Sequence, residues 1–239
     1  MNNEMSVNFS FRIQMDNIPL SEIIGQFLFL VTELNNLLGQ QYEWFETGYS
    51  KKEALSHIAF KNNEISKSTL LKWEGRYKKE YPIFVESVWD GKGDYSNAIN
   101  YRKMFFEPSN RVNVELHLVS QSGKINVNSF VELFSKISFY FECSYINADN
   151  KGYRFFDKNV FPDRLSVGWM LYVPHVLLPE LIPEAARVIP VMDGKQQKGT
   201  IVVSTEEIFD GNNKEHIGKA NDIEIKLLDL GLLPLMTEL

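Results

Sequence analysis

Residues 161–203 read FPDRLSVGWMLYVPHVLLPELIPEAARVIPVMDGKQQKGTIVV, and this stretch decides the fold. Its first part, residues 165–173, places leucine, valine and tryptophan on one face of an alternating pattern. Met170 and Tyr172 make the opposite face apolar as well, so the pattern predicts a central strand that is buried on both sides. Pro174 cannot donate a hydrogen bond to a sheet and is expected to end the strand.

A second strand is expected at residues 199–204, after a turn built from Asp193 and Gly194. The segment between the two strands, residues 177–188, contains two prolines. We therefore expect at most a brief helical piece or a turn there, with Pro183 as a candidate for the first helical position.

The N-terminal half alternates strand and helix patterns. Residues 7–14 predict a half-exposed strand, and an apolar stripe predicts a helix at residues 22–38, capped by Ser21 and ended by Gly39. Residues 66–77 fit either a further helix or a long polar connection. Three strand patterns then predict an antiparallel meander, with an Asp-Gly turn signal between the first two. These patterns cover residues 82–89, 97–106 and 111–119.

The C-terminal half repeats this order loosely. Residues 127–141 form a second apolar helix pattern, with Asn126 or Asn128 as its cap, and residues 145–158 fit a loop or a short strand. A last helix is expected at residues 222–230. The sequence therefore predicts an α+β fold, in which long apolar helices cover one side of an antiparallel sheet. We expect one domain over residues 1–239, with residues 1–122 and 123–239 as possible pseudo-halves.

Composition limits the class of protein. The chain has 239 residues, of which 44% are hydrophobic and 23% are charged, as in a soluble globular protein. Cys143 is the single cysteine, which excludes an intramolecular disulfide and suits a buried position in a reducing compartment. The N-terminus does not resemble a signal peptide, and no apolar run is long enough for a membrane span. We therefore expect a cytoplasmic protein without membrane contact.

The net charge of −6 argues against direct nucleic-acid binding and favours a basic partner, although mild acidity also serves solubility.

The histidines show no metal-binding spacing, and the glycines of DGKGD fit a turn better than a phosphate site. Glu206, Glu207 and Asp210 fit the solvated start of a helix better than a catalytic set. We predict no catalytic, cofactor-binding or metal-binding residue, and hence no enzyme. An enzyme with scattered carboxylates and a non-catalytic adaptor are the alternatives. The four histidines are His57, His117, His175 and His216.

Ordered short motifs carry a family resemblance, supported before residue 161 by spaced aromatics such as Trp44 and Trp89. Together they resemble the immunity protein 52 family, whose members are antidotes to bacterial polymorphic toxins. The resemblance implies a cytoplasmic protein that binds and neutralises a secreted toxin, commonly a nuclease of restriction-endonuclease-like type delivered by contact-dependent or type VI secretion. The motifs are FPDR (161–164), GWMLY (168–172), PEAARV (183–188), KGTIVVST (198–205), HIGKANDIE (216–224) and LLP (232–234).

Two short segments combine carboxylates with aromatic anchors, as a surface that blocks a basic toxin would require. They are YEWFE (42–46) and WDGKGDY (89–95). In the simpler alternative, Trp44 and Trp89 are buried and the acids are ordinary loop charges. Trp73 lies outside the two segments, also in polar surroundings. The predicted partner-binding residues are Tyr42, Trp44, Glu46, Trp89, Asp90, Asp94 and Tyr95. The second choice is an acidic C-terminal set formed by Glu206, Glu207, Asp210, Glu215, Asp222 and Glu224.

Overall fold

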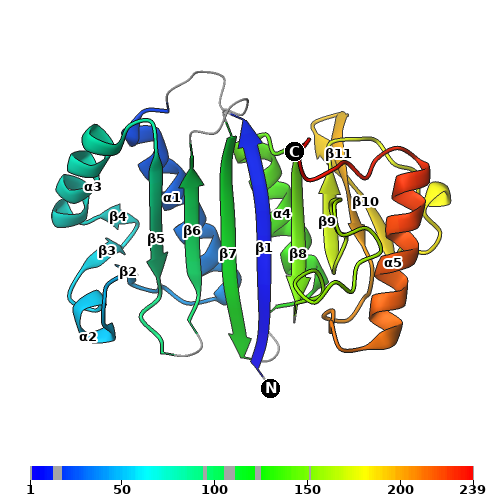
Figure 1. The fold of residues 1–239 in the computed structure, drawn as a ribbon, viewed down its shortest axis with the longest axis horizontal. Coiled ribbons are helices and arrows are strands. Elements are labelled where there is room, and N and C mark those ends of the chain that lie inside the picture. Colours follow the sequence, from blue (N-terminus) through cyan, green and yellow to red (C-terminus); the bar gives the residue numbers. More distant parts are fainter. Residues whose placement is uncertain are drawn as a thin grey trace. The chain divides into compact units, whose positions relative to one another are not determined.

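The computed structural model describes residues 2–12, 18–93, 96–104, 111–121, 125–150 and 152–238, and it confirms the α+β class with antiparallel strands (Figure 1). Contacts within the chain define two compact units. The first unit comprises Met1–Asn2 and Arg12–Ile125, and the second comprises Asn3–Phe11 together with Asn126–Leu239. The N-terminal strand therefore packs with the C-terminal half of the chain.

The first unit contains an antiparallel sheet whose strands follow the order β7-β6-β5-β2-β3-β4. The predicted meander is confirmed as β5, β6 and β7, whereas the short β3–β4 hairpin was not predicted. The end of the second predicted strand, residues 105–106, lies outside the described residues. The elements are α1 (Leu20–Leu38), β2 (Trp44–Glu46), α2 (Lys51–Ala54), β3 (Ile58–Lys61), β4 (Glu64–Ile65), α3 (Lys67–Glu80), β5 (Phe84–Trp89), β6 (Ala98–Lys103) and β7 (Arg111–Gln121).

The two helix predictions in this unit are largely confirmed. Helix α1 ends at Gly39, which adopts the left-handed conformation with φ of 61°. Its cap is Pro19 and not Ser21, because the carbonyl oxygen of Pro19 already accepts from the N–H groups of the first turn. Residues 67–80 form helix α3, so the alternative of a long polar connection is wrong. Ser66 caps this helix by accepting a hydrogen bond from the N–H of Thr69 over 3.1 Å.

Aromatic side chains fill the core of the first unit. Phe27 of α1 lies 4.9 Å from Trp73 of α3 and 5.3 Å from Tyr101 of β6, measured between ring centroids. All three are fully buried, so Trp73 is a core residue despite its polar surroundings in the sequence. The opposite face of the meander is polar, since Arg102 and Glu115 form an ion pair there at 3.5 Å.

The second unit contains an antiparallel sheet with strand order β10-β11-β9-β8-β1. Strand β9 is central among these five, as predicted. The predicted first strand extended to residues 13–14, which lie outside the described residues. The elements are β1 (Asn2–Arg12), α4 (Val127–Phe141), β8 (Tyr145–Asn150), β9 (Met170–Val173), the 3₁₀ helix η1 (Pro179–Leu181), β10 (Arg187–Asp193), β11 (Gln196–Val203) and α5 (Lys214–Asp229).

The central strand is shorter than predicted, because residues 165–169 are buried without belonging to it. Gly168 has φ of +58°, and a Cβ atom there would lie 2.5 Å from the carbonyl oxygen of Ala148. The next residue, Trp169, donates its backbone N–H to that same oxygen over 2.8 Å. The chain therefore bends at Gly168 before it enters β9.

The segment between the two predicted strands is also different. A brief helical piece exists at η1, but no helix begins at Pro183; instead, Arg187 opens β10, in which Ile189 pairs with Ile201 of β11. The β-branched residues in this stretch favour a strand, and β11 supplies its partner. The predicted turn at Asp193 and Gly194 is confirmed as the link between β10 and β11.

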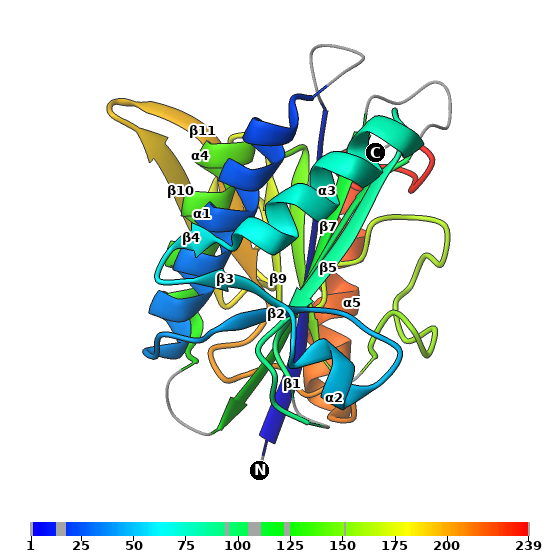
Figure 2. The same cartoon turned by 90° about the vertical axis from the view of Figure 1, so that its left-hand side faces the viewer.

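Helices cover both faces of the second unit's sheet, not one face as predicted. Phe130 of α4 lies 4.9 Å from Trp169 on one face, and Ile223 of α5 joins the apolar cluster of Leu171 and Val173 on the other. Figure 2 shows α4 and α5 on opposite sides of β9. The residue pattern of β9, apolar on both faces, is explained by this position between two helices.

Both of these helices begin at asparagine. Of the two predicted caps of α4, Asn126 and Asn128, the structure has Asn126, which forms a capping box with Ser129. Asn213 caps α5, which therefore starts eight residues before the predicted residue 222. The first two turns of α5 were missed because residues 214–219 are mostly polar.

Candidate partner-binding site

The two segments that the sequence suggested separately lie side by side in the first unit. Strand β2 pairs with β5 so that Phe45 lies opposite Trp89, and their ring centroids are 6.4 Å apart. The indole N–H of Trp89 donates to the backbone carbonyl oxygen of Glu46 over 3.1 Å. We refer to the surface formed by Tyr42, Phe45, Trp89 and Lys92 as the β2–β5 surface.

The side chains of this surface hold one another in place. The Nζ of Lys92 donates to the hydroxyl of Tyr42 over 2.8 Å and lies 4.3 Å from the centre of its ring. Gly91 has φ of +74°, and a Cβ atom there would lie 2.8 Å from the ring of Phe45, so only glycine lets the β5–β6 turn lie this close. Tyr42, Phe45 and Trp89 are each partly exposed.

Trp44 lies in the interior and does not belong to the surface. It is fully buried, and its indole N–H donates to Oδ1 of Asn35 on α1 over 3.2 Å. The same oxygen accepts from the backbone N–H of Tyr42 over 3.2 Å. The prediction that Trp44 is an exposed anchor for a partner is therefore wrong. Trp44 instead fixes β2 against α1.

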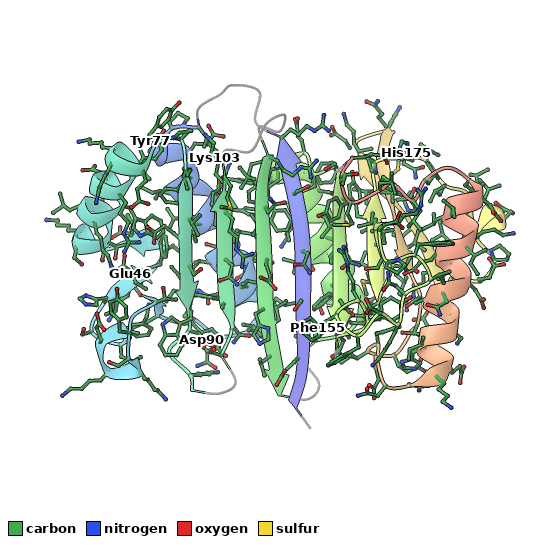
Figure 3. All side chains as sticks on the ribbon, viewed as in Figure 1. Glu46, Tyr77, Asp90, Lys103, Phe155 and His175 are labelled. Carbon is green, nitrogen blue, oxygen red and sulfur yellow. The ribbon has the colours of Figure 1, made fainter. Side chains whose placement is uncertain are left out.

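Glu46 is buried as well, beneath α3 (Figure 3). Its carboxylate accepts from Nζ of Lys72 over 2.7 Å and from the indole N–H of Trp73 over 3.1 Å. The nearby Glu86 accepts from Arg76, yet burial raises the pKa of Glu86 above its ordinary value, and the charge of Glu46 adds to this rise. Two carboxylates are thus held beneath α3 by Lys72 and Arg76.

Asp90 is a third internal carboxylate, at the end of β5 (Figure 3). It accepts from Nδ2 of Asn97 over 2.6 Å and from the backbone N–H of Lys92 over 3.2 Å. Asn97 in turn accepts from the backbone N–H of Val119 over 2.8 Å. Asp90 therefore fixes the β5–β6 turn. The predicted residues Asp94 and Tyr95 lie outside the described residues.

These positions change the expected electrostatics of the surface. The placement of Glu46 and Asp90 on an exposed acidic patch is wrong, because both are buried and bonded within the unit. Two exposed lysines lie at this surface: Nζ of Lys92 contacts Tyr42, and Nζ of Lys51 lies 3.1 Å from the position of a Cβ atom at Gly93. The β2–β5 surface is therefore aromatic with lysines around it, and partner binding by Tyr42 and Trp89 stays a prediction.

The second-choice acidic set in the second unit is also partly internal. Glu224 of α5 is fully buried and accepts three hydrogen bonds, from the N–H groups of Val160 (2.8 Å) and Val167 (2.9 Å) and from the hydroxyl of Tyr153 (3.0 Å). Burial raises the pKa of Glu224, and these donors oppose the rise. Its role is to hold the β8–β9 connection on α5.

Most of the other members of this set are exposed. Glu206 pairs with Arg187 of β10, and the hydrogen bond from that guanidinium lowers the pKa of Glu206. Glu215 pairs with Lys219 at 3.3 Å, and Glu207 and Asp222 are exposed. Asp210 is half-buried and accepts from the backbone N–H of Asn212 over 2.9 Å.

Two further observations concern chemistry and membranes. Burial raises the pKa of the Cys143 thiol well above its ordinary value, so this cysteine is not a thiolate at neutral pH and lies in the interior as predicted. Within the described residues, no three histidine, cysteine or carboxylate side chains gather as metal ligands. No helix in that part of the chain is both long and apolar enough to cross a lipid bilayer.

Comparisons with known proteins give a likeness of fold. No protein-family model matches the sequence, and no curated protein matches it, so the resemblance to the immunity protein 52 family stays a prediction. Among solved structures, the chain is similar to the Pseudomonas aeruginosa T6SS protein PA0821, with a TM-score of 0.59 and 10% sequence identity. The similarity covers 95% of this chain and 76% of that chain, and at this identity it establishes a shared fold.

Proposed function

We propose that this chain is an immunity protein that binds a toxin delivered by type VI secretion and blocks its activity. The observation that carries the proposal is the fold shared with a P. aeruginosa T6SS protein over 95% of the chain. The motifs between residues 161 and 234 point the same way, because they resemble a family of antidotes to secreted toxins.

The β2–β5 surface supports a function by binding. Its aromatic side chains are held by the contacts of Trp89 with Glu46 and of Tyr42 with Lys92, so little conformational freedom remains to be lost on association. Aromatic residues that are partly exposed and held in one conformation are typical anchors of protein interfaces. We assign Tyr42 and Trp89 to the contact with the toxin.

The toxin is proposed to be a nuclease. A nuclease domain presents a basic surface to its substrate, and a partner with a net charge of −6 meets such a surface with favourable long-range attraction. The carboxylates that supply this attraction are the exposed ones, such as Glu207 and Asp222, and not the buried Glu46 and Asp90.

Co-expression tests this function. The chain is produced in cells together with each toxin domain encoded beside its gene, and growth is compared with cells that carry the toxin alone. We expect one toxin to be neutralised and to form a one-to-one complex with a dissociation constant of about 1 nM, or about −12 kcal/mol. Leu71→Ala, which changes an exposed side chain on α3, serves as the control and should protect fully. Failure to rescue growth against every neighbouring toxin would contradict the proposal.

A further inference from the structure

The second unit contains a cavity of about 370 Å³ between the end of α4 and the strands β9, β10 and β11. Phe139 and Tyr172 contribute aromatic walls, and Glu142, Asp193 and Lys198 contribute charged groups. This volume is near the lower end of the range for ligand sites, which suits a single long side chain better than a large cofactor. No local sequence pattern indicates this cavity, because its residues come from four separate elements.

The electrostatics of the cavity favour a cation. Glu142 is the residue that ends α4, and it has a left-handed conformation with φ of 48°. The last turn of α4 contains no basic residue, so the partial negative charge of the helix C-terminus adds to the charge of Glu142. Asp193, the last residue of β10, adds a second carboxylate.

Lys198 compensates these charges only in part. Its Nζ lies 3.7 Å from Oδ2 of Asp193, and both side chains are about half exposed. Ion pairs at such distance and exposure contribute little, typically below about 1 kcal/mol. Lys198 is therefore a weak internal competitor that another cation can displace from Asp193.

The inner wall of the cavity is uncharged. Burial raises the pKa of the Tyr172 hydroxyl. The Cys143 thiol is also buried, and its Sγ donates to the carbonyl oxygen of Ile137 over 3.9 Å. Phe139 is partly exposed at the opening. The cavity thus combines an uncharged, aromatic interior with two carboxylates, as a long side chain with a terminal cation requires.

We infer that this cavity receives an arginine or lysine side chain of a partner protein. The planar guanidinium of arginine fits best, because it stacks on aromatic rings and pairs with carboxylates at the same time. The identity of the partner rests on the proposed function, since a toxin with a basic substrate-binding surface offers such side chains. Glu142 and Asp193 bind the cation, and Phe139 and Tyr172 bind its stem.

Titration with a matched pair of small probes tests the cavity directly. The ¹⁵N-labelled full chain is titrated with N-acetyl-arginine amide and with N-acetyl-citrulline amide, which has nearly the same shape but no charge. We expect millimolar binding of the arginine probe, with shifts at the amides of Glu142, Cys143 and Asp193, and at least about tenfold weaker binding of the citrulline probe. Equal binding of the two probes, or shifts elsewhere only, would overturn the inference.

Variants sharpen this test. Glu142→Gln and Asp193→Asn should each weaken binding of the arginine probe, whereas Lys198→Met should strengthen it several-fold by removing the internal competitor. Asp229→Asn, at an exposed position of α5, is the control and should bind the probe like the wild type. Circular dichroism confirms that each variant is folded. Weaker binding by Lys198→Met would contradict the assignment of this lysine as a competitor and overturn the inference.

The two proposals fail in different ways. If the wild type neutralises a toxin and the Glu142→Gln, Asp193→Asn double variant dissociates from it at the same rate, the inference falls and the proposed function stands. If no toxin is neutralised but the arginine probe binds selectively, the cation site stands and the proposed function falls. Micromolar affinity for the free arginine probe would identify a small-molecule site and overturn the assignment to a protein side chain.

Discussion

The indole N–H of Trp89 donates to the backbone carbonyl oxygen of Glu46 over 3.1 Å, across the antiparallel pair of β2 and β5. This bond joins two segments that lie 43 residues apart in the chain. It orients the indole by its polar edge and leaves part of the ring exposed. Trp89 therefore has both a structural contact and a surface available to a partner.

Substitution of Trp89 separates these two roles. Trp89→Phe removes the N–H donor and part of the ring but keeps an aromatic side chain, and loss of the hydrogen bond should lower the free energy of unfolding by about 1 kcal/mol, measured by urea denaturation. Trp89→Ala should in addition speed dissociation of the toxin complex, with a loss of about 2 kcal/mol or more in binding free energy. Binding kinetics by biolayer interferometry measure this loss, with Leu71→Ala as the control. A folded Trp89→Ala variant with an unchanged dissociation rate would show that the toxin binds elsewhere.

Asp90→Ala should destabilise the first unit without a direct effect on association. The change leaves the Nδ2 of the buried Asn97 without its acceptor, which costs about 1–3 kcal/mol. Urea denaturation measures this cost, and Asp222→Ala, an exposed acid, should stay within about 0.5 kcal/mol of the wild type. A slower association rate together with unchanged stability would instead place Asp90 on the partner surface.

Glu224 should make stability depend on pH. Its pKa is raised in the folded state, so the folded protein holds this proton more tightly than the unfolded chain. Its favourable contribution is complete below the unfolded value of about 4.3 and is lost as pH rises through the raised folded value. Burial raises the pKa of Glu86 and Asp149 in the same direction, so the wild type should lose part of its stability from this window upward.

Glu224→Gln tests this linkage. The variant should be less stable than the wild type, because its amide nitrogen faces backbone N–H donors that the carboxylate accepted. The difference in the free energy of unfolding should be largest near pH 5 and shrink toward pH 8, since the variant lacks the titrating group. Asp222→Asn should leave the pH profile unchanged. A difference that grows with pH would contradict the direction of the shift.

Two glycine substitutions should have opposite effects on the second unit. Gly168→Ala adds a Cβ atom 2.5 Å from the carbonyl oxygen of Ala148, at a positive φ, and should lower the free energy of unfolding by more than about 1–3 kcal/mol. Gly218→Ala, within α5, places the new Cβ more than 4 Å from all atoms other than its chain neighbours and the helix's own backbone, and should raise the free energy of unfolding by about 0.5–1 kcal/mol. Thermal denaturation of both variants measures the contrast. A neutral Gly168→Ala variant would show that the bend before β9 adapts.

Long-range pairing accounts for the differences between the predicted and observed site. The sequence shows that YEWFE and WDGKGDY are aromatic and acidic, but it does not show that β2 pairs with β5. Nor does it show that Lys72 and Trp73 of α3 cover Glu46, because they are 26 and 27 residues distant. A carboxylate is exposed or buried according to its spatial neighbours. Composition does not contain this information, and for this reason the prediction that Glu46 and Asp90 lie on the surface was wrong.

The sequence by itself determined the elements whose signals are local. Gly39 ends α1, and the two apolar faces of residues 170–173 place β9 at the centre of its sheet, because caps and periodicity act over a few residues. The tertiary structure decided what depends on distant partners. It pairs Val7 of β1 with Ala148 of β8 and turns residues 187–193 into a strand beside β11. Strand pairing and the burial of charge are set by contacts between residues far apart in the chain, and a single sequence does not encode these contacts as a local pattern.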